Sequence, residues 1–127
     1  MASGIEYVKG EITTIAHVAT GTITVGDTLV IDKNLAIARN SGTSGDTIQC
    51  AITGVWLLPK VSAAVIKAGE EVLWDISAAT ATGEVDDNAA TVAAGDLDGF
   101  GYAIEGAGNG ETTVKVALTP NTATIGS

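Results

Sequence analysis

Residues that favour extended backbone dominate this chain of 127 residues. Val, Ile and Thr number 12, 12 and 17, against only seven Leu. Side chains branched at Cβ lose rotamer freedom in a helix and pack well on a pleated sheet. The 16 glycines lie between the apolar runs, where they permit the backbone conformations of tight turns. The sequence therefore predicts an all-β protein, a small barrel or sandwich of short antiparallel strands.

Alternation of apolar and polar residues locates several of these strands. It is clearest over residues 47–53, 100–104 and 114–118, and a period of two is the spacing of a half-buried strand. Two segments lack this period and are rich in small and polar residues, 40–46 and 77–99. We expect both to be loops, the second with room for one short strand.

The stretch from residue 54 to 75 holds both tryptophans, Trp56 and Trp74, and one of the two prolines, Pro59. The proline ends an apolar run because it cannot donate a ladder hydrogen bond. The segment that follows predicts one short helix near residues 61–68, with Ser62 as its cap and Gly69 just past its end. Each indole is expected to anchor the core or a subunit contact, since an indole can bury a large area.

A weak internal repeat is visible. GDTLVID at 26–32 resembles GEEVLWD at 69–75, and GDT at 45–47 resembles GET at 110–112. In each case a glycine turn and an acidic residue precede an apolar strand, and the acidic side chain can accept hydrogen bonds from free backbone N–H groups. Two packed halves built from hairpins would explain the pattern. Chance similarity in a chain rich in Gly and Thr is the alternative.

The length suits one domain. We expect a flexible N-terminal arm at residues 1–8, a single β domain at 9–119 and a C-terminal tail at 120–127. Within the arm, Ile5 and Tyr7 alternate only partly with their polar neighbours, so an edge-pairing segment that docks on another protein is one interpretation. The alternative is that Tyr7 and Val8 already belong to the first strand of the domain.

The charge balance excludes several kinds of partner. The formal net charge is −9 with a pI near 4.2, and no basic patch is present, so we expect neither nucleic acid nor an anionic membrane as a partner. No apolar run is long enough to span a bilayer, and the N-terminus lacks the pattern of a secretory signal. A single cysteine, Cys50, excludes an intramolecular disulfide and is expected to be a buried small hydrophobe.

Residues for catalysis or metal binding are sparse. His17, the only histidine, could pair with Cys50 in a small hydrolase, but no nucleophile motif supports this. One His and one Cys make a zinc site improbable, and the loop carboxylates at Asp86, Asp87, Asp96 and Asp98 do not follow the twelve-residue calcium pattern. The sequence therefore predicts no enzyme, no cofactor and no metal site.

Six segments together resemble a known family. They are YVKGE at 7–11, VGDTLVI at 25–31, ITGVWLLPK at 52–60, KAGEEVLWD at 67–75, GYAIE at 101–105 and GETTVKVAL at 110–118. In this order they resemble DUF2190, a family whose members look like capsid cement, or decoration, proteins of tailed bacteriophages. The resemblance spans about residues 7–119. The segment 77–99 runs longer than the family pattern, and the first residues are individual to this chain.

The resemblance implies a virion protein that binds the outside of the expanded capsid and stabilises it. It implies the major capsid protein as partner, self-association as a homotrimer, and location on the capsid surface after a stage in the host cytoplasm. Trp56, Trp74, Pro59, Tyr7 and Ile5 are the structural or interface candidates. The alternative function is a small β carbohydrate-binding or adhesin-like module.

Overall fold

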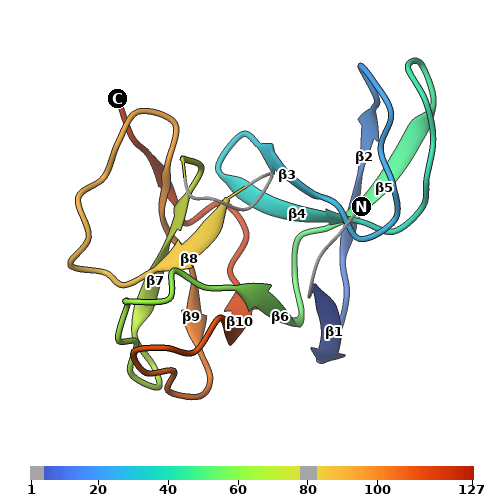
Figure 1. Ribbon diagram of the computed structural model, residues 1–127. Helices are drawn as coiled ribbons and strands as arrows, with labels where there is room; N and C mark the ends of the chain where they lie inside the picture. The colour runs from blue at the N-terminus through green and yellow to red at the C-terminus, as the bar shows by residue number, and fades with distance from the viewer. Residues whose placement is uncertain (1–4, 78–82) are drawn as a thin grey trace.

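The computed structural model describes residues 5–77 and 83–127, and these form an all-β protein without a helix. Its strands are short and lie in two antiparallel sheets (Figure 1), which confirms the predicted fold class. The strand bounds are β1 (Glu6–Lys9), β2 (Thr14–Val18), β3 (Thr28–Ile31), β4 (Asn34–Ala38), β5 (Thr47–Ala51), β6 (Val55–Pro59), β7 (Glu71–Asp75), β8 (Glu84–Asp86), β9 (Leu97–Ala103), β10 (Thr113–Leu118) and β11 (Thr124–Ile125).

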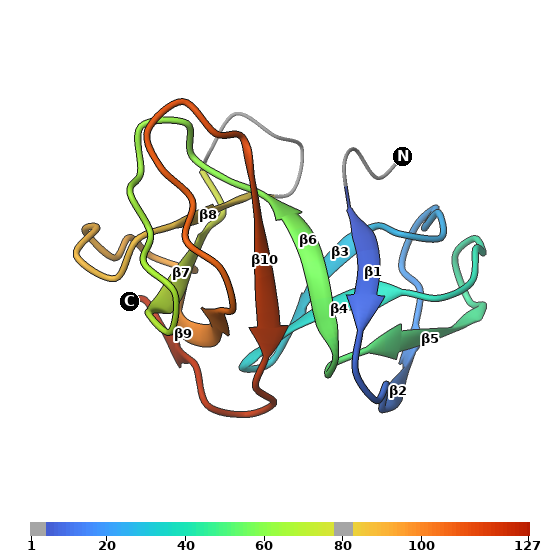
Figure 2. The same cartoon turned by 90° about the horizontal axis from the view of Figure 1, so that it is seen from below.

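The two sheets differ in size, but four strands of each have the same spatial order relative to the chain. The larger has the order β1-β6-β10-β9-β7-β8, with β11 paired to β9, and the smaller has the order β2-β5-β4-β3. Figure 2 shows β10, β6 and β1 side by side, with β4 crossing behind β6 and β1. The central four strands of the larger sheet have the spatial order β6-β10-β9-β7, and the smaller sheet has the order β2-β5-β4-β3. In both sets of four, the first strand in chain order lies at one end, and its neighbours are the fourth, the third and the second strand in turn.

This correspondence extends to individual hydrogen bonds. Gly26 and Asp27 exchange backbone bonds with Ala38, and Gly69 and Glu70 exchange the same bonds with Ala103. Ile23 pairs with Gly42 in an isolated bridge, as Ile66 pairs with Ala107. The predicted internal repeat is therefore real: β2, β3, β4 and β5 correspond to β6, β7, β9 and β10.

An acidic turn recurs five times. Its third residue is a glycine with φ between 87° and 95°, and its fourth is Asp or Glu. The N–H of the fourth residue donates to the carbonyl of the first, and the carboxylate of the fourth accepts from the N–H of the first. This is a type II turn, whose third position requires positive φ. The turns lie at 24–27, 43–46, 67–70, 93–96 and 108–111.

The described residues form two hydrophobic clusters, of which the larger holds the two sheets together. The larger lies between them and takes Leu35, Ile37 and Ala51 from the smaller sheet. The opposite face of the same strands supplies Ala36, Ala38 and Cys50 to a second, smaller cluster. Since successive strand residues point to opposite faces, β4 is buried on both sides and is the central strand of the molecule.

The predicted helix near residues 61–68 does not form. Helical bonding would join the Ser62 carbonyl to the Ile66 N–H, but Ile66 donates to Ala107 and the Ser62 carbonyl accepts from Gly110. The only local backbone bonds here are turn bonds, such as Ala64 N–H to the Val61 carbonyl. The good helix formers in this segment are overridden by pairing with the turn at 108–111.

The first and the last strands of the described residues, β1 and β11, both belong to the larger sheet. Tyr7 and Val8 belong to β1, which pairs with β6, so the predicted arm cannot extend to residue 8; its residues 1–4 lie outside the described part of the chain. In the predicted tail, Thr124 and Ile125 pair with β9. Asn121, at φ 60°, donates its N–H to Asn34 Oδ1 at 2.8 Å and thus joins the C-terminal segment to the smaller sheet.

Candidate functional site

Trp56 lies at the junction of three segments. Its ring packs edge-on against Tyr7 with centroids 5.5 Å apart, and the Arg39 guanidinium carbon lies 5.4 Å from the ring centroid. Its Nε1 donates to the Thr53 carbonyl at 3.0 Å. Only 2% of the residue is exposed. Trp56 therefore connects β1, β6 and the end of β4, and its role is that of a core anchor.

Trp74 is more deeply buried than Trp56. It is fully inaccessible and packs edge-on against Phe100 with centroids 5.9 Å apart. Its Nε1 is buried and finds no hydrogen-bond acceptor within residues 5–77 and 83–127. Gly83, at φ 136°, passes so close that an added Cβ would lie 2.7 Å from this nitrogen. The indole fits a space that only glycine leaves open.

The remaining sequence candidates also belong to the body of the protein. Ile5 packs against the larger cluster, and Pro59 is the buried last residue of β6, opposite Thr113. Tyr7 is 45% exposed, and its hydroxyl donates to the Gly10 carbonyl at 2.5 Å. The structure brings Tyr7 and Trp56 together, whereas Trp74 lies on β7, which β10 and β9 separate from β6 in the sheet. Of the five, Tyr7 alone presents a large exposed surface.

Lys60 is a buried charged residue that the sequence pattern did not single out. It follows Pro59 and is 2% exposed, yet it carries an ammonium group. Its Nζ donates to the carbonyls of Val61 at 2.7 Å, Ser62 at 3.2 Å and Ala64. Burial lowers the pKa of Lys60, and the negative charges of Glu111, Asp86 and Asp87 oppose that shift. A lysine between a proline and an apolar segment was the available signal.

The cage around Lys60 shapes the segment that replaces the predicted helix. Three carbonyls of residues 61–64 point at one ammonium group, an arrangement that a helix excludes because helical carbonyls all point along the axis. Val65, which follows the cage, is 55% exposed. Lys60 therefore fixes a surface loop and displays an apolar side chain on it.

His17 and Cys50 do not form a catalytic pair. Cys50 lies opposite Ile15 across the β2–β5 ladder, and its Sγ contacts the Ile48 carbonyl at 3.7 Å. Burial raises the pKa of the Cys50 thiol, which disfavours the nucleophilic thiolate. No cluster of three His, Cys, Asp or Glu side chains suited to a metal ion occurs in the described residues. These residues also contain no helix capable of crossing a bilayer.

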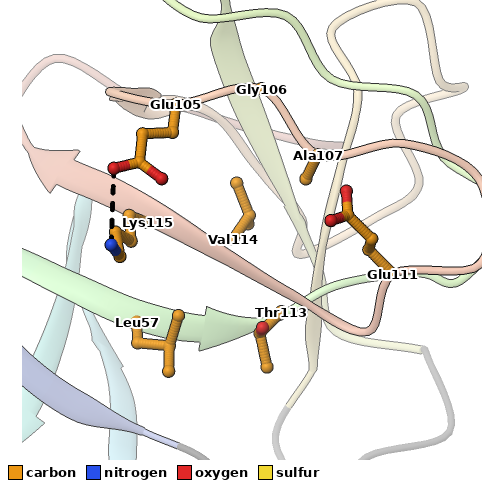
Figure 3. Close-up of a pocket in the computed structure, with 8 residues that line it drawn as sticks. All are labelled: Leu57, Glu105, Gly106, Ala107, Glu111, Thr113, Val114 and Lys115. Carbon is orange, nitrogen blue, oxygen red and sulfur yellow. Dashed lines mark hydrogen bonds and ion pairs between the residues drawn. The ribbon is translucent and has the colours of Figure 1, made fainter.

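A shallow depression of about 140 Å³ lies where β6 and β10 meet the loop that follows β9 (Figure 3). Leu57, Thr113 and Val114 form part of its wall, and an ion pair between Glu105 and Lys115, 3.3 Å long, borders it. The Glu111 carboxylate on its other side accepts from the Gly108 N–H. Its charged groups already have partners, so this depression offers no catalytic arrangement.

Several large apolar side chains are exposed to solvent. They include Val18 at 60%, Val25 at 53% and Val65 at 55%. Single apolar side chains are exposed on most protein surfaces, so these residues alone do not mark a binding site.

Comparison with known proteins agrees with this geometry. No curated protein and no solved structure matches the chain. A family model described as phage cement protein matches residues 7–118, a range that begins in β1 and ends with β10 and so includes both sheets. Because this match covers nearly the whole chain, the protein belongs to the phage cement protein family, whose place is the capsid of the virion.

Proposed function

We propose that this protein binds the outside of the expanded capsid through contacts with the major capsid protein and thereby stabilises the shell. The family match over residues 7–118 is the observation that carries the proposal. A ligand that binds only one state of a shell stabilises that state by its binding free energy. Such a function requires a rigid surface and no reacting group, so we propose that the protein is not an enzyme.

The proposal extends to assembly. The protein is made in the host cytoplasm and joins the capsid surface, where three copies associate around each three-fold or quasi-three-fold position, as the resemblance implies. The net charge of −9 supports a partner with a basic or neutral face, and it disfavours nucleic acid and anionic membranes as partners.

The carbohydrate-binding alternative gains no support from the aromatic residues. Sugar sites use exposed aromatic faces, but Trp56, Trp74 and Phe100 are at most 2% exposed. Tyr7 and Tyr102 are partly exposed, and Tyr7 packs edge-on against Trp56.

The proposal is tested with expanded capsids that lack a decoration protein, incubated with the purified chain and imaged by electron microscopy. We expect regular density on the outer surface and a higher temperature of capsid disruption. Unexpanded capsids are the control and should remain bare. Expanded capsids that stay bare at saturating protein would contradict the proposal.

A further inference from the structure

Strand β2 leaves one of its edges unpaired. Its neighbour in the smaller sheet is β5. Just outside the two strands, Ile52 N–H donates to the Thr13 carbonyl and Ala19 N–H donates to the Asp46 carbonyl, so the odd-numbered residues of this stretch are the ones hydrogen-bonded toward β5. Because hydrogen bonding alternates along an antiparallel strand, the main-chain groups of Thr14, Ala16 and Val18 point away from β5. They have no hydrogen-bond partner in the described residues.

This edge lacks the features that keep edges from pairing. Charged side chains and bulges are the usual protection. The outer strands of the larger sheet have them: β1 carries Glu6 and Lys9 and a bulge, and β8 carries Glu84 and Asp86. β2 has the sequence TIAHV, without Lys, Arg, Asp, Glu or Pro, and its burial alternates regularly.

The internal repeat shows what the equivalent edge accepts. β6, which corresponds to β2, pairs with β10 on one side and with β1 on the other, antiparallel. An added antiparallel strand is therefore compatible with this position of the four-stranded unit. In the smaller sheet the described residues supply no such strand.

Charge favours a second copy as the occupant. Residues 11–54, which form the smaller sheet, hold four of the 15 acidic and two of the six basic residues. The rest of the chain carries most of the net charge of −9, so two copies repel each other least where their smaller sheets meet. Figure 1 shows β2 and β5 projecting together from the molecule.

We propose that two copies of this chain pair antiparallel through β2, centred on Ala16. In this register Thr14 of each copy faces Val18 of the other, and the three outward residues form hydrogen-bonded pairs, with about six main-chain bonds in all. Ile15 faces His17 on the other side of the ribbon. Ala16, small and exposed, faces its own equivalent at the two-fold axis. The two four-stranded sheets become one.

The contact differs from the trimer proposed above. An isologous contact closes at two copies, so it joins either two monomers or two trimers. It does not depend on capsid binding, and it can therefore be right or wrong independently of the cement function.

The test places charge at the two-fold axis. Like charges directly opposite each other in a sheet destabilise strand pairing. Ala16→Lys and Ala16→Glu should therefore each halve the particle mass measured by light scattering, where the parent mass is an even multiple of the chain mass of 12.7 kDa. An equimolar mixture of the two variants should recover the parent mass, since opposite charges then face each other. Val92→Lys, at a position 40% exposed outside the sheet, is the matched control and should keep the parent mass.

Because Ala16 is exposed, both variants should retain the circular dichroism spectrum of the parent. A parent that has the same mass as both variants at every concentration would overturn the proposal. If that happens while the variants lose affinity for expanded capsids, the edge binds an extended segment of the shell protein instead. Failure of the mixture to recover the parent mass would exclude the antiparallel register centred on Ala16.

Discussion

Lys60 shows how one buried charge organises a loop. Its ammonium group is held by three main-chain carbonyls, and each bond to a charged group contributes more than a neutral one. The cage explains why an alanine-containing segment with good helix propensity is not helical. The residue therefore determines the local fold even though its own side chain is hidden from solvent.

Replacing Lys60 by methionine should destabilise the protein by about 3 kcal/mol, because three carbonyls lose their shared donor while the apolar stem is kept. Urea unfolding measures the change. Lys67→Met, at an exposed lysine, is the control and should cost less than about 0.5 kcal/mol. Equal costs for the two variants would contradict the role of the cage.

Two substitutions of Trp74 distinguish how ring packing and the indole nitrogen contribute to the free energy of unfolding. Trp74→Ala should cost about 4 kcal/mol, since it empties a fully buried site. Trp74→Phe should cost distinctly less, because it retains an aromatic ring against Phe100 and removes a donor that has no acceptor in the described residues. Thermal unfolding of both variants checks the order, and a Phe variant as unstable as the Ala variant would mean that the nitrogen is bonded after all.

Asp86 should make stability depend on pH in the direction opposite to most carboxylates. Burial, with the nearby charges of Asp87 and Asp75, raises its pKa in spite of the Asp87 N–H and Lys60. Because the pKa of Asp86 is higher in the folded than in the unfolded protein, the carboxyl group stabilises the fold at pH values below the unfolded-state pKa, near 3.9. This stabilisation is lost as pH rises through the folded-state pKa. Asp86→Asn should therefore stabilise the protein at pH 7 and lose that advantage at low pH. Asp98→Asn, at an exposed site, is the comparison and should gain less.

At the scale of elements, the acidic turn is the repeated unit of construction. Four of its five glycine and acid pairs were recognisable in the sequence, because each precedes an apolar strand; the pair at Gly95 and Asp96 was missed because the segment before it has no period. Several strand positions were also predictable, because apolar and polar residues alternate along those strands. The position of Lys60 between a proline and an apolar segment could have marked the lysine as unusual, but no local rule states that three carbonyls will converge on its ammonium group.

The turn glycines supply a matched pair of substitutions. An added Cβ meets nothing within 4 Å at either Gly45 or Gly21, but φ at Gly45 is 94°. Gly45→Ala should thus cost about 1–2 kcal/mol through backbone strain alone. Gly21→Ala should be neutral or stabilising by less than about 1 kcal/mol. Denaturant midpoints decide, and similar midpoints for the two variants would mean that the turn relaxes to negative φ.

At the scale of the whole molecule, the candidate surface was less predictable than the fold. Tyr7, Ile5 and both indoles were candidates either for the core or for an interface, and within one chain all but Tyr7 lie largely in the core. Their size marked them as anchors, and sequence alone does not say whether an anchor lies inside one chain or between two. The unpaired edge of β2 was invisible for a related reason: pairing partners are a property of the assembled sheet.

The repeat raises the question whether the two halves fold separately. The smaller sheet has its own cluster, but that cluster consists mainly of alanine, isoleucine and one cysteine, while Leu35 and Ile37 on its other face are buried against the larger sheet. Burial of those two side chains contributes about 2 kcal/mol each, and Asn34 adds bonds to the C-terminal segment. The smaller sheet alone would lose both.

We therefore expect a single cooperative transition, with no populated state in which one sheet is folded and the other is not. Native-state hydrogen exchange is the measurement, since it reports the opening free energy of each amide. The slowest amides of β5 and β10, which occupy equivalent positions in the two halves, should open with the same free energy, and Ile37→Ala should lower both by the same amount. If only β5 responds to that substitution, the two halves are separate folding units, and burial of Leu35 and Ile37 against the larger sheet does not couple them.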